Sequence, residues 1–182
     1  MDDVRLRPIE FSDWRAVHGW AKLIDSCRYQ GWGPNTEAET ESYVRESAAL
    51  WHSLPQTSFP QAVLAGSTVI GIADLHLRGS AQAEIGYGIH PARWGRGAAT
   101  AAARELLRQA FTEHNLHRVY ATCDPRNAGS ARVLTKIGMT YEGRMRETVL
   151  IRDGWRDSDL HAILEQEWRA REGVPAQGSA RV

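Results

Sequence analysis

Apolar positions near the start of the chain predict a short strand followed by two helices. Val4–Arg7 alternates apolar and basic residues and is ended by Pro8. Ser12 and Asp13 offer an N-cap for the first helix, and Thr36–Glu39 has the capping-box pattern that opens the second. The residues expected to face inward from these helices are Trp14, Val17, Ala21, Ile24, Tyr43, Val44, Ala48, Trp51 and Leu54.

Three segments of strand character follow, separated by short turns. They are Gln61–Ala65, Thr68–Leu77 and Ala83–Ile89, joined at Gly66-Ser67 and around Gly79. Consecutive strands with connections this short usually pair with each other, so we expect an antiparallel meander.

The clearest helical pattern covers Ala99–Phe111, where apolar residues recur every three or four positions. The next strand is Arg118–Cys123. Because a helix separates it from Ala83–Ile89, we expect these two strands to be parallel neighbours.

The last part of the chain predicts one more helix and two more strands. Asn127 is a candidate N-cap for a helix that stops at Gly138, and the strands cover Thr140–Ile151 and Ser158–Leu164. The fold class is therefore α/β, with a mixed, mostly antiparallel sheet flanked by helices in the order β-αα-βββ-α-β-α-ββ.

Composition narrows the class of protein. The 182 residues suffice for one domain, which we place at residues 1–170, and residues 171–182 are expected to form a disordered tail. Lys plus Arg number 22 and Asp plus Glu number 22, so no strong field favours nucleic acid or a membrane as partner. No signal peptide, membrane span, CxxC pair or metal-ligand spacing is evident. We therefore expect a soluble, cytoplasmic protein that binds no metal.

The segment from Glu84 to Ala99 is the most informative for chemistry. A strand runs into a loop marked by Pro91, then through Gly95 and Gly97 into the clearest helix. Small residues let backbone N–H groups converge on an anion, and the helix N-terminus adds partial positive charge. The pattern predicts a pyrophosphate seat, with Arg96 as a side-chain contact. Its glycine spacing fits neither a P-loop nor a Rossmann dinucleotide site.

Together with later motifs, this segment resembles the GNAT acetyltransferase superfamily, most closely the branch of ribosomal-protein alanine N-acetyltransferases (RimJ and RimL type). The family's Gln/Arg-x-x-Gly-x-Gly/Ala signature falls on Trp94–Ala99, where Trp94 replaces the polar first position. The resemblance runs from about Val4 to Leu164. The later motifs that carry it are Asn127–Leu134, Gly138-Met139, Glu142–Glu147 and Asp157–Leu164.

The resemblance implies a GNAT-like fold with acetyl-CoA as the acyl-donor cosubstrate. The main chain of Arg96–Thr100 would hold the pyrophosphate, and Ile89-His90-Pro91 would bind the pantetheine arm like an added strand. A backbone N–H near Ile89 would polarise the thioester carbonyl, and Asn127 would bind the pantetheine. The implied cofactor-binding residues are Ile89, His90, Pro91, Gly95, Arg96, Gly97, Ala98, Ala99, Thr100 and Asn127.

Direct acetyl transfer to an amine needs a base for the ammonium group and an acid for the departing thiolate. The candidate bases are Glu84, where the strand approaches the loop, and Glu147, in a late strand that lines the acceptor side in relatives. Ser130 is the candidate acid, and Tyr141 is a further possible donor. Relatives in this branch are thought to use a glutamate where this chain has Val149.

Tyr29 and Trp32 lie in the loop between the first two helices, which frames the acceptor cleft in relatives. Their rings either bind the substrate or anchor the loop. The acceptor stays open between a protein N-terminal amine and a small amine such as an amino acid, polyamine or antibiotic. A non-catalytic acyl-CoA-binding module and a longer acyl donor are the alternatives. A monomer or homodimer is expected.

Overall fold

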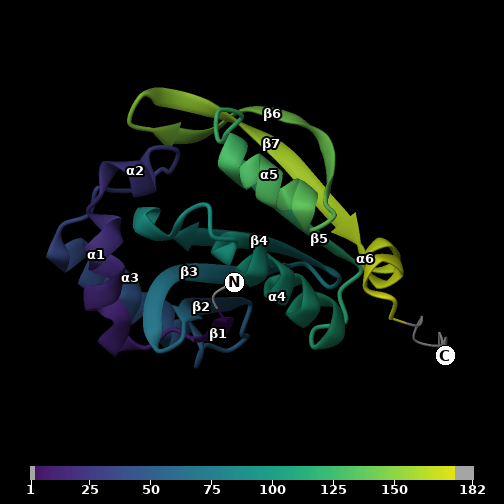
Figure 1. The fold of residues 1–182 in the computed structure, drawn as a ribbon, viewed down its shortest axis with the longest axis horizontal. Helices are drawn as coiled ribbons and strands as arrows, with labels where there is room; N and C mark the ends of the chain where they lie inside the picture. The colour runs from purple at the N-terminus through teal and green to yellow at the C-terminus, as the bar shows by residue number, and fades with distance from the viewer. Residues whose placement is uncertain (1–2, 175–182) are drawn as a thin grey trace.

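Seven strands form one sheet in the order β1-β2-β3-β4-β5-β7-β6 in the computed structural model, which describes residues 3–174 (Figure 1). The strands are β1 (Val4–Pro8), β2 (Ser58–Ala65), β3 (Thr68–Arg78), β4 (Gln82–Ile89), β5 (Arg118–Cys123), β6 (Thr140–Ile151) and β7 (Gly154–Leu164). The helices are α1 (Trp14–Ala21), α2 (Ile24–Cys27), α3 (Glu37–Leu50), α4 (Ala98–Thr112), α5 (Ala128–Lys136) and α6 (Glu165–Glu172), with 3₁₀ turns η1 (Phe11–Asp13) and η2 (Pro91–Arg93). All neighbouring strands are antiparallel except β4 and β5, so the predicted fold class and strand order are confirmed.

Helices cover both faces of the sheet. In Figure 1, α4 and α5 lie in front of the strands, and α4 buries Leu106, Leu107 and Phe111 at 1% exposure or less. On β3, Ala73 packs into the cluster that contains α4, whereas its neighbour Ile72 packs against α1 and α3. Because successive strand residues point to opposite faces, α1 and α3 cover the face opposite α4. Each large apolar side chain buried in this way contributes about 1.5–3 kcal/mol.

Two strands begin three or more residues earlier than predicted. β2 begins at Ser58 rather than Gln61, and β7 begins at Gly154 rather than Ser158. Pro60 reads as a strand breaker, yet it pairs in register with β3, and its carbonyl accepts hydrogen bonds from two other segments. Long-range pairing therefore overrides the local signal.

Asp13 occupies the N-cap position of α1 as predicted, but the expectation that Ser12 or Asp13 caps this helix through its side chain is wrong. These residues belong to the 3₁₀ turn η1, and Asp13, which precedes α1, makes no capping hydrogen bond to that helix. Its carboxylate is 6% exposed and accepts two 2.7 Å hydrogen bonds from Arg7 and one from the Glu10 N–H. The contact joins η1 to β1. A capping rule considers only residues next to the helix, so it could not predict the pairing of Asp13 with Arg7 on the preceding strand.

This ion pair predicts an acid-sensitive contribution to stability. Burial disfavours the charge on Asp13, but the hydrogen bonds from Arg7 and the Glu10 N–H, together with the positive charge of Arg7, outweigh burial and lower the pKa of the carboxyl. The contribution is therefore present above the pKa of the unfolded state and is lost as pH falls through the folded pKa. We expect Asp13→Ala to lower the free energy of unfolding at pH 7 by about 2 kcal/mol, measured by urea denaturation.

The matched control is Asp25→Ala, which removes an exposed carboxylate paired with Arg28. It should change the unfolding free energy by less than about 0.5 kcal/mol. Equal losses in the two variants would show that the Arg7–Asp13 contact does not stabilise the fold specifically.

Three residues predicted to face inward are exposed instead: Ile24 by 49%, Tyr43 by 38% and Leu54 by 95%. α1 has ended before Ile24, and α3 has ended before Leu54, so the helical period does not extend to either residue. Val17 and Val44 are buried as predicted. The Thr36–Glu39 capping box, the Asn127 cap and the Gly66-Ser67 hairpin turn are also confirmed.

The C-terminal boundary differs from the prediction. α6 includes Arg171 and Glu172, which were assigned to the tail, and ends at Gly173 in a left-handed conformation. Residues 175–182 of the predicted tail lie outside the described residues.

Candidate active site

β4 and β5 pair over only three residues and then separate. Gln82–Glu84 registers with Arg118–Tyr120, whereas β4 stays paired with β3, and β5 with β7, along their length. Figure 1 shows the two strands converging at one end and diverging toward the other. The sheet therefore forks, with residues 85–89 on one side and residues 121–123 on the other.

The main chain of β4 presents N–H groups to this fork. The His90 N–H donates to the Ile70 carbonyl at 2.8 Å, on the β3 side. In an antiparallel ladder every second residue bonds to the same neighbour. Gly86 and Gly88 therefore bond to β3 as His90 does. Ile85, Tyr87 and Ile89 alternate with them and direct their N–H groups toward β5, beyond the point where β4 and β5 stop pairing.

The fork ends at an exposed glycine loop that leads into α4. Gly95 and Gly97 have φ of +75° and +86°, a region that favours glycine, and Gly97 is the N-cap of the helix. A cap without a side chain leaves the first N–H groups of α4 without a side-chain acceptor. With the helix dipole, these groups form a seat for an anion.

Two side-chain contacts fix the loop. The Trp94 indole Nε1 donates to the Ile89 carbonyl at 2.7 Å, and His90 Nδ1 accepts from the Ala92 N–H at 3.1 Å. The carbonyl of Ile89 is thus occupied, which leaves its N–H for a ligand in the fork. The Nδ1 atom of His90 serves the loop rather than proton transfer.

Across the fork, α5 brings Ser130 against Tyr87. The Asn127 side chain caps α5 by accepting from the Ser130 N–H at 3.1 Å. The Tyr87 hydroxyl lies 3.1 Å from Ser130 Oγ, and burial raises the pKa of this tyrosine, so its hydroxyl stays neutral. The sequence reasoning missed Tyr87; its place between Gly86 and Gly88 in β4 was the available signal.

The two predicted bases occupy different positions. Glu84 lies at the closed end of the fork, and its carboxylate accepts two hydrogen bonds from Arg78, at 2.8 and 3.3 Å. Glu147 lies in a bulge of β6 with φ +50°, and its N–H donates to Asp157 Oδ1 at 3.0 Å. Tyr141 is 53% exposed and stacks edge-on against His161. The structure does not bring these residues together.

An open groove of about 430 Å³ runs along β4, β5, β6 and β7. Its lining residues are Gln82, Glu84, Arg118, Tyr120, Thr122, Met145, Thr148, Val149, Ser158 and Leu160. Because Val119 and Ala121 of β5 belong to the cluster that contains α4, Tyr120 and Thr122 face the opposite side of the sheet. The groove therefore lies on the face opposite α4 and α5.

The loop between α2 and α3 carries the two aromatic candidates. Trp32 is 39% exposed and packs edge-on against Trp20, with ring centroids 6.2 Å apart. The guanidinium carbon of Arg126 lies over the Tyr29 ring, 5.7 Å from the ring centroid. The two rings have different partners and do not form one wall.

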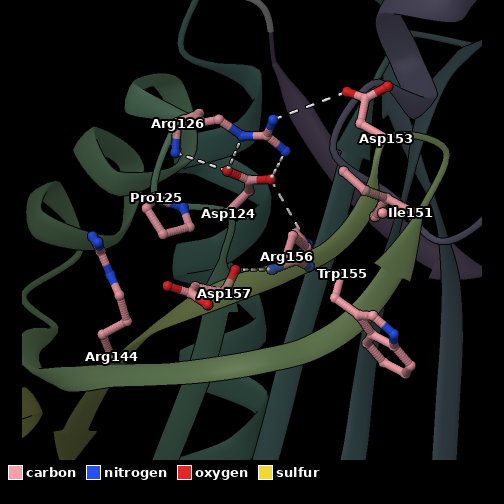
Figure 2. Close-up of a pocket in the computed structure, with 10 residues that line it drawn as sticks. Asp124, Pro125, Arg126, Arg144, Ile151, Asp153, Trp155, Arg156 and Asp157 are labelled. Carbon is pink, nitrogen blue, oxygen red and sulfur yellow. Dashed lines mark hydrogen bonds and ion pairs between the residues drawn. The ribbon is translucent and has the colours of Figure 1, made fainter.

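A second pocket, of about 310 Å³, lies where β5 ends beside the β6–β7 hairpin. Figure 2 shows Asp124 between the guanidinium groups of Arg126 and Arg156, with Asp153 also facing Arg126. Burial opposes ionisation of Asp124, but the Arg126 hydrogen bonds lower its pKa below the usual value. These charges neutralise one another, so the cluster anchors the hairpin and leaves no free charge for chemistry.

Residues 3–174 hold no group of three or more His, Cys, Asp or Glu side chains arranged to bind a metal. Within the same range, no helix is both long and apolar enough to cross a membrane.

A sheet that forks beside a helix N-terminus without a side-chain cap, with a glycine loop between them, defines an acyltransferase of the GNAT type. The chain belongs to the GNAT acetyltransferase family, because residues 3–140 match the family model described as "Acetyltransferase (GNAT) domain". It is therefore an acyltransferase enzyme.

Individual relatives agree with this assignment. The chain is 34% identical to the uncharacterized N-acetyltransferase YnaD of Bacillus subtilis, over 90% of this chain and 94% of that one. It is 28% identical to spermidine N(1)-acetyltransferase of Escherichia coli, over 96% and 92%. The solved structure of Mycobacterium smegmatis RimJ in complex with CoA-disulfide superposes with a TM-score of 0.76, 27% identity and coverage of 93% and 89%. The predicted resemblance to the RimJ branch is thus confirmed.

Proposed function

We propose that the protein is an N-acetyltransferase that moves an acetyl group from acetyl-CoA directly to an amine. The observation that carries this proposal is the fork between β4 and β5, which leads to the glycine loop at the start of α4. A fork edged by N–H groups suits an extended pantetheine arm, and the loop suits a pyrophosphate. The structure of the RimJ relative with CoA-disulfide supports CoA as the carrier.

The donor would be held mainly by main-chain groups. The N–H groups from Arg96 to Thr100, with Gly95 and Gly97 giving close approach, would bind the pyrophosphate. The edge at Ile89, His90 and Pro91 would bind the pantetheine from one side, and Asn127 would bind it from α5. A backbone N–H near Ile89, on the fork side of β4, would polarise the thioester carbonyl as negative charge develops on its oxygen.

The transfer forms a C–N bond and breaks the C–S bond of the thioester. We assign protonation of the departing thiolate to the Ser130 hydroxyl, which the Tyr87 hydroxyl supports from behind at 3.1 Å. The sequence proposes Glu84 and Glu147 as acceptors of the ammonium proton. Glu84 already accepts two hydrogen bonds from Arg78, which limits its freedom to move.

The groove on the open face is the proposed acceptor site, and Trp32 and Tyr29 are the proposed aromatic contacts to the acceptor. Glu84 is its one acidic lining residue, and it is paired with Arg78; Arg118, also in the lining, is paired with Glu142. A neutral groove suits an acceptor with a single amine, such as a peptide N-terminus. The relative named spermidine N(1)-acetyltransferase supports a small polyamine as the second candidate.

We expect acetyl-CoA to release thiol in the presence of a short peptide with a free N-terminal alanine. The value of kcat/KM should exceed that for spermidine by about tenfold, because the groove has no unpaired carboxylate for a second ammonium group. The measurement is thiol release against a panel of peptides, amino acids, polyamines and aminoglycosides. The same peptide with an acetylated N-terminus is the control and should release none.

Faster transfer to spermidine would reverse the order of the two acceptor candidates. If no acceptor of the panel causes thiol release although acetyl-CoA binds tightly, the result would instead support the non-catalytic acyl-CoA-binding module. Replacing acetyl-CoA by propionyl- and butyryl-CoA tests the longer-donor alternative, which requires them to react faster.

A further inference from the structure

Asp74 is a partly buried carboxylate in the middle of β3. It lies in register with Pro60 of β2 and Gly86 of β4. Among residues 3–174, no hydrogen bond or ion pair to its side chain occurs. Buried carboxylates usually have such partners, so an unpaired one beside a reactive site needs an explanation.

The face that carries Asp74 is hollow at the neighbouring β4 position. A Cβ atom built on Gly86 would meet no other atom within 4 Å. One built on Gly88 would lie 3.9 Å from both Trp20 and Ile72, which close the hollow on that side. Residues opposite each other in an antiparallel pair project to the same face, so Asp74 borders the space above Gly86.

The hollow is level with the open part of the fork. Gly86 lies between Ile85 and Tyr87, whose N–H groups face the fork, and pairs with Asp74 at a Cα separation of about 5.5 Å. Glu84 precedes Gly86 by two residues, so their Cα atoms are about 6.6 Å apart, and it lies where β4 and β5 still pair. Asp74 is thus level with the open part of the fork, whereas Glu84 is level with its closed end.

We propose that Asp74 is the catalytic base, which accepts the proton of the acceptor ammonium group in the hollow above Gly86. The inference rests on the proposed acetyl-transfer function. The ammonium group gives one proton to the Asp74 carboxylate, and the freed amine attacks the thioester carbon. The C–S bond then breaks, the thiolate takes a proton from Ser130, the amide nitrogen loses its second proton to restore Ser130, and Asp74 releases its proton to water.

The surroundings of Asp74 suit this role. Burial raises the pKa of its carboxyl to about 7, near the value at which a general base works best at neutral pH. The ionisable groups nearest to Asp74 on this face are His76 of β3 and Glu84 of β4, two positions along each strand, and Tyr43 of α3, which interacts electrostatically with Asp74. Burial raises the pKa of Tyr43 and lowers that of His76, which keeps both neutral, and Arg78 pairs with Glu84.

The test is the pH profile of Asp74→Asn with the fastest acceptor of the panel. We expect kcat at pH 7 to fall by about 10²- to 10⁴-fold while the affinity for acetyl-CoA, measured by calorimetry, stays unchanged. The acid limb of the wild-type kcat profile, centred near pH 7, should disappear. The remaining rate should rise about tenfold per pH unit until the acceptor amine deprotonates by itself.

Two further variants make the assignment specific. Asp25→Asn changes an exposed carboxylate far along the chain and should leave the profile unchanged. Glu84→Gln tests the competing base; loss of the acid limb in this variant, and not in Asp74→Asn, would overturn the inference. Such an outcome leaves the acetyl-transfer function standing, whereas a wild-type enzyme inactive toward every acceptor would overturn both.

A measurement without acceptor adds an independent test. In protein labelled with ¹³C at aspartate carboxyl carbons, we expect one resonance to titrate near pH 7 and to be missing from Asp74→Asn. If all aspartate carboxyls of the wild-type protein titrate below pH 5, Asp74 is not the base.

Discussion

Replacing Gly97 with glutamate is expected to abolish acetyl-CoA binding. The residue caps α4 at φ +86°, and its neighbouring N–H groups form the anion seat. A carboxylate at this position would occupy the seat or repel the pyrophosphate, and a side chain would strain the left-handed backbone. We expect the dissociation constant measured by calorimetry to rise by about 100-fold or more.

The matched control is Gly79→Glu, in the turn between β3 and β4. Gly79 also has a positive φ, at +68°, and a Cβ there would likewise meet no atom within 4 Å. The two variants therefore share the charge change and the backbone strain, but Gly79 lies at the opposite end of β4. Similar losses of acetyl-CoA affinity in both variants would show that strain, and not the anion seat, explains the result.

Asp74→Asn is expected to stabilise the fold at pH 8 while it impairs catalysis. The folded-state pKa of Asp74 is about 7, above the ordinary value of 3.8, so the folded protein holds this proton more tightly than the unfolded chain. Wild-type stability should therefore fall as pH rises from about 4 to 7, and the full penalty applies above that range. For a partly exposed group this penalty is about 2–4 kcal/mol, which asparagine avoids.

Thermal unfolding across pH 4 to 8 measures this effect. The variant should unfold about 5–10 °C above the wild type at pH 8, and the difference should vanish near pH 4. A constant difference at every pH would mean that Asp74 does not titrate in this window. Combined with reduced turnover, the expected result would identify a charged group kept for function at the expense of stability.

The sequence predicted most of the fold because its signals are local. The Thr36–Glu39 box caps α3, Asn127 caps α5, and the Gly66-Ser67 turn joins β2 and β3 as expected. The Ala-rich apolar face of α4 was predictable from the helical spacing of its apolar residues alone. Predictions failed where a residue from another element determines the contact. The Asp13 carboxylate, for example, binds Arg7 of β1 instead of capping α1.

Residue type and spacing were enough to predict the family, the order of the strands along the chain and the glycine loop that precedes α4. Which carboxylates lie beside the fork depends on how the strands and helices pack together. Asp74 belongs to no recognisable sequence motif. It is proposed as the base because it borders the open space over Gly86 on the adjacent strand. The pairing of Glu84 with Arg78, and the contact of Tyr87 with Ser130 on α5, likewise arise only when separate elements pack together. Proton transfer depends on distance and burial, and neither is fixed until the chain has folded.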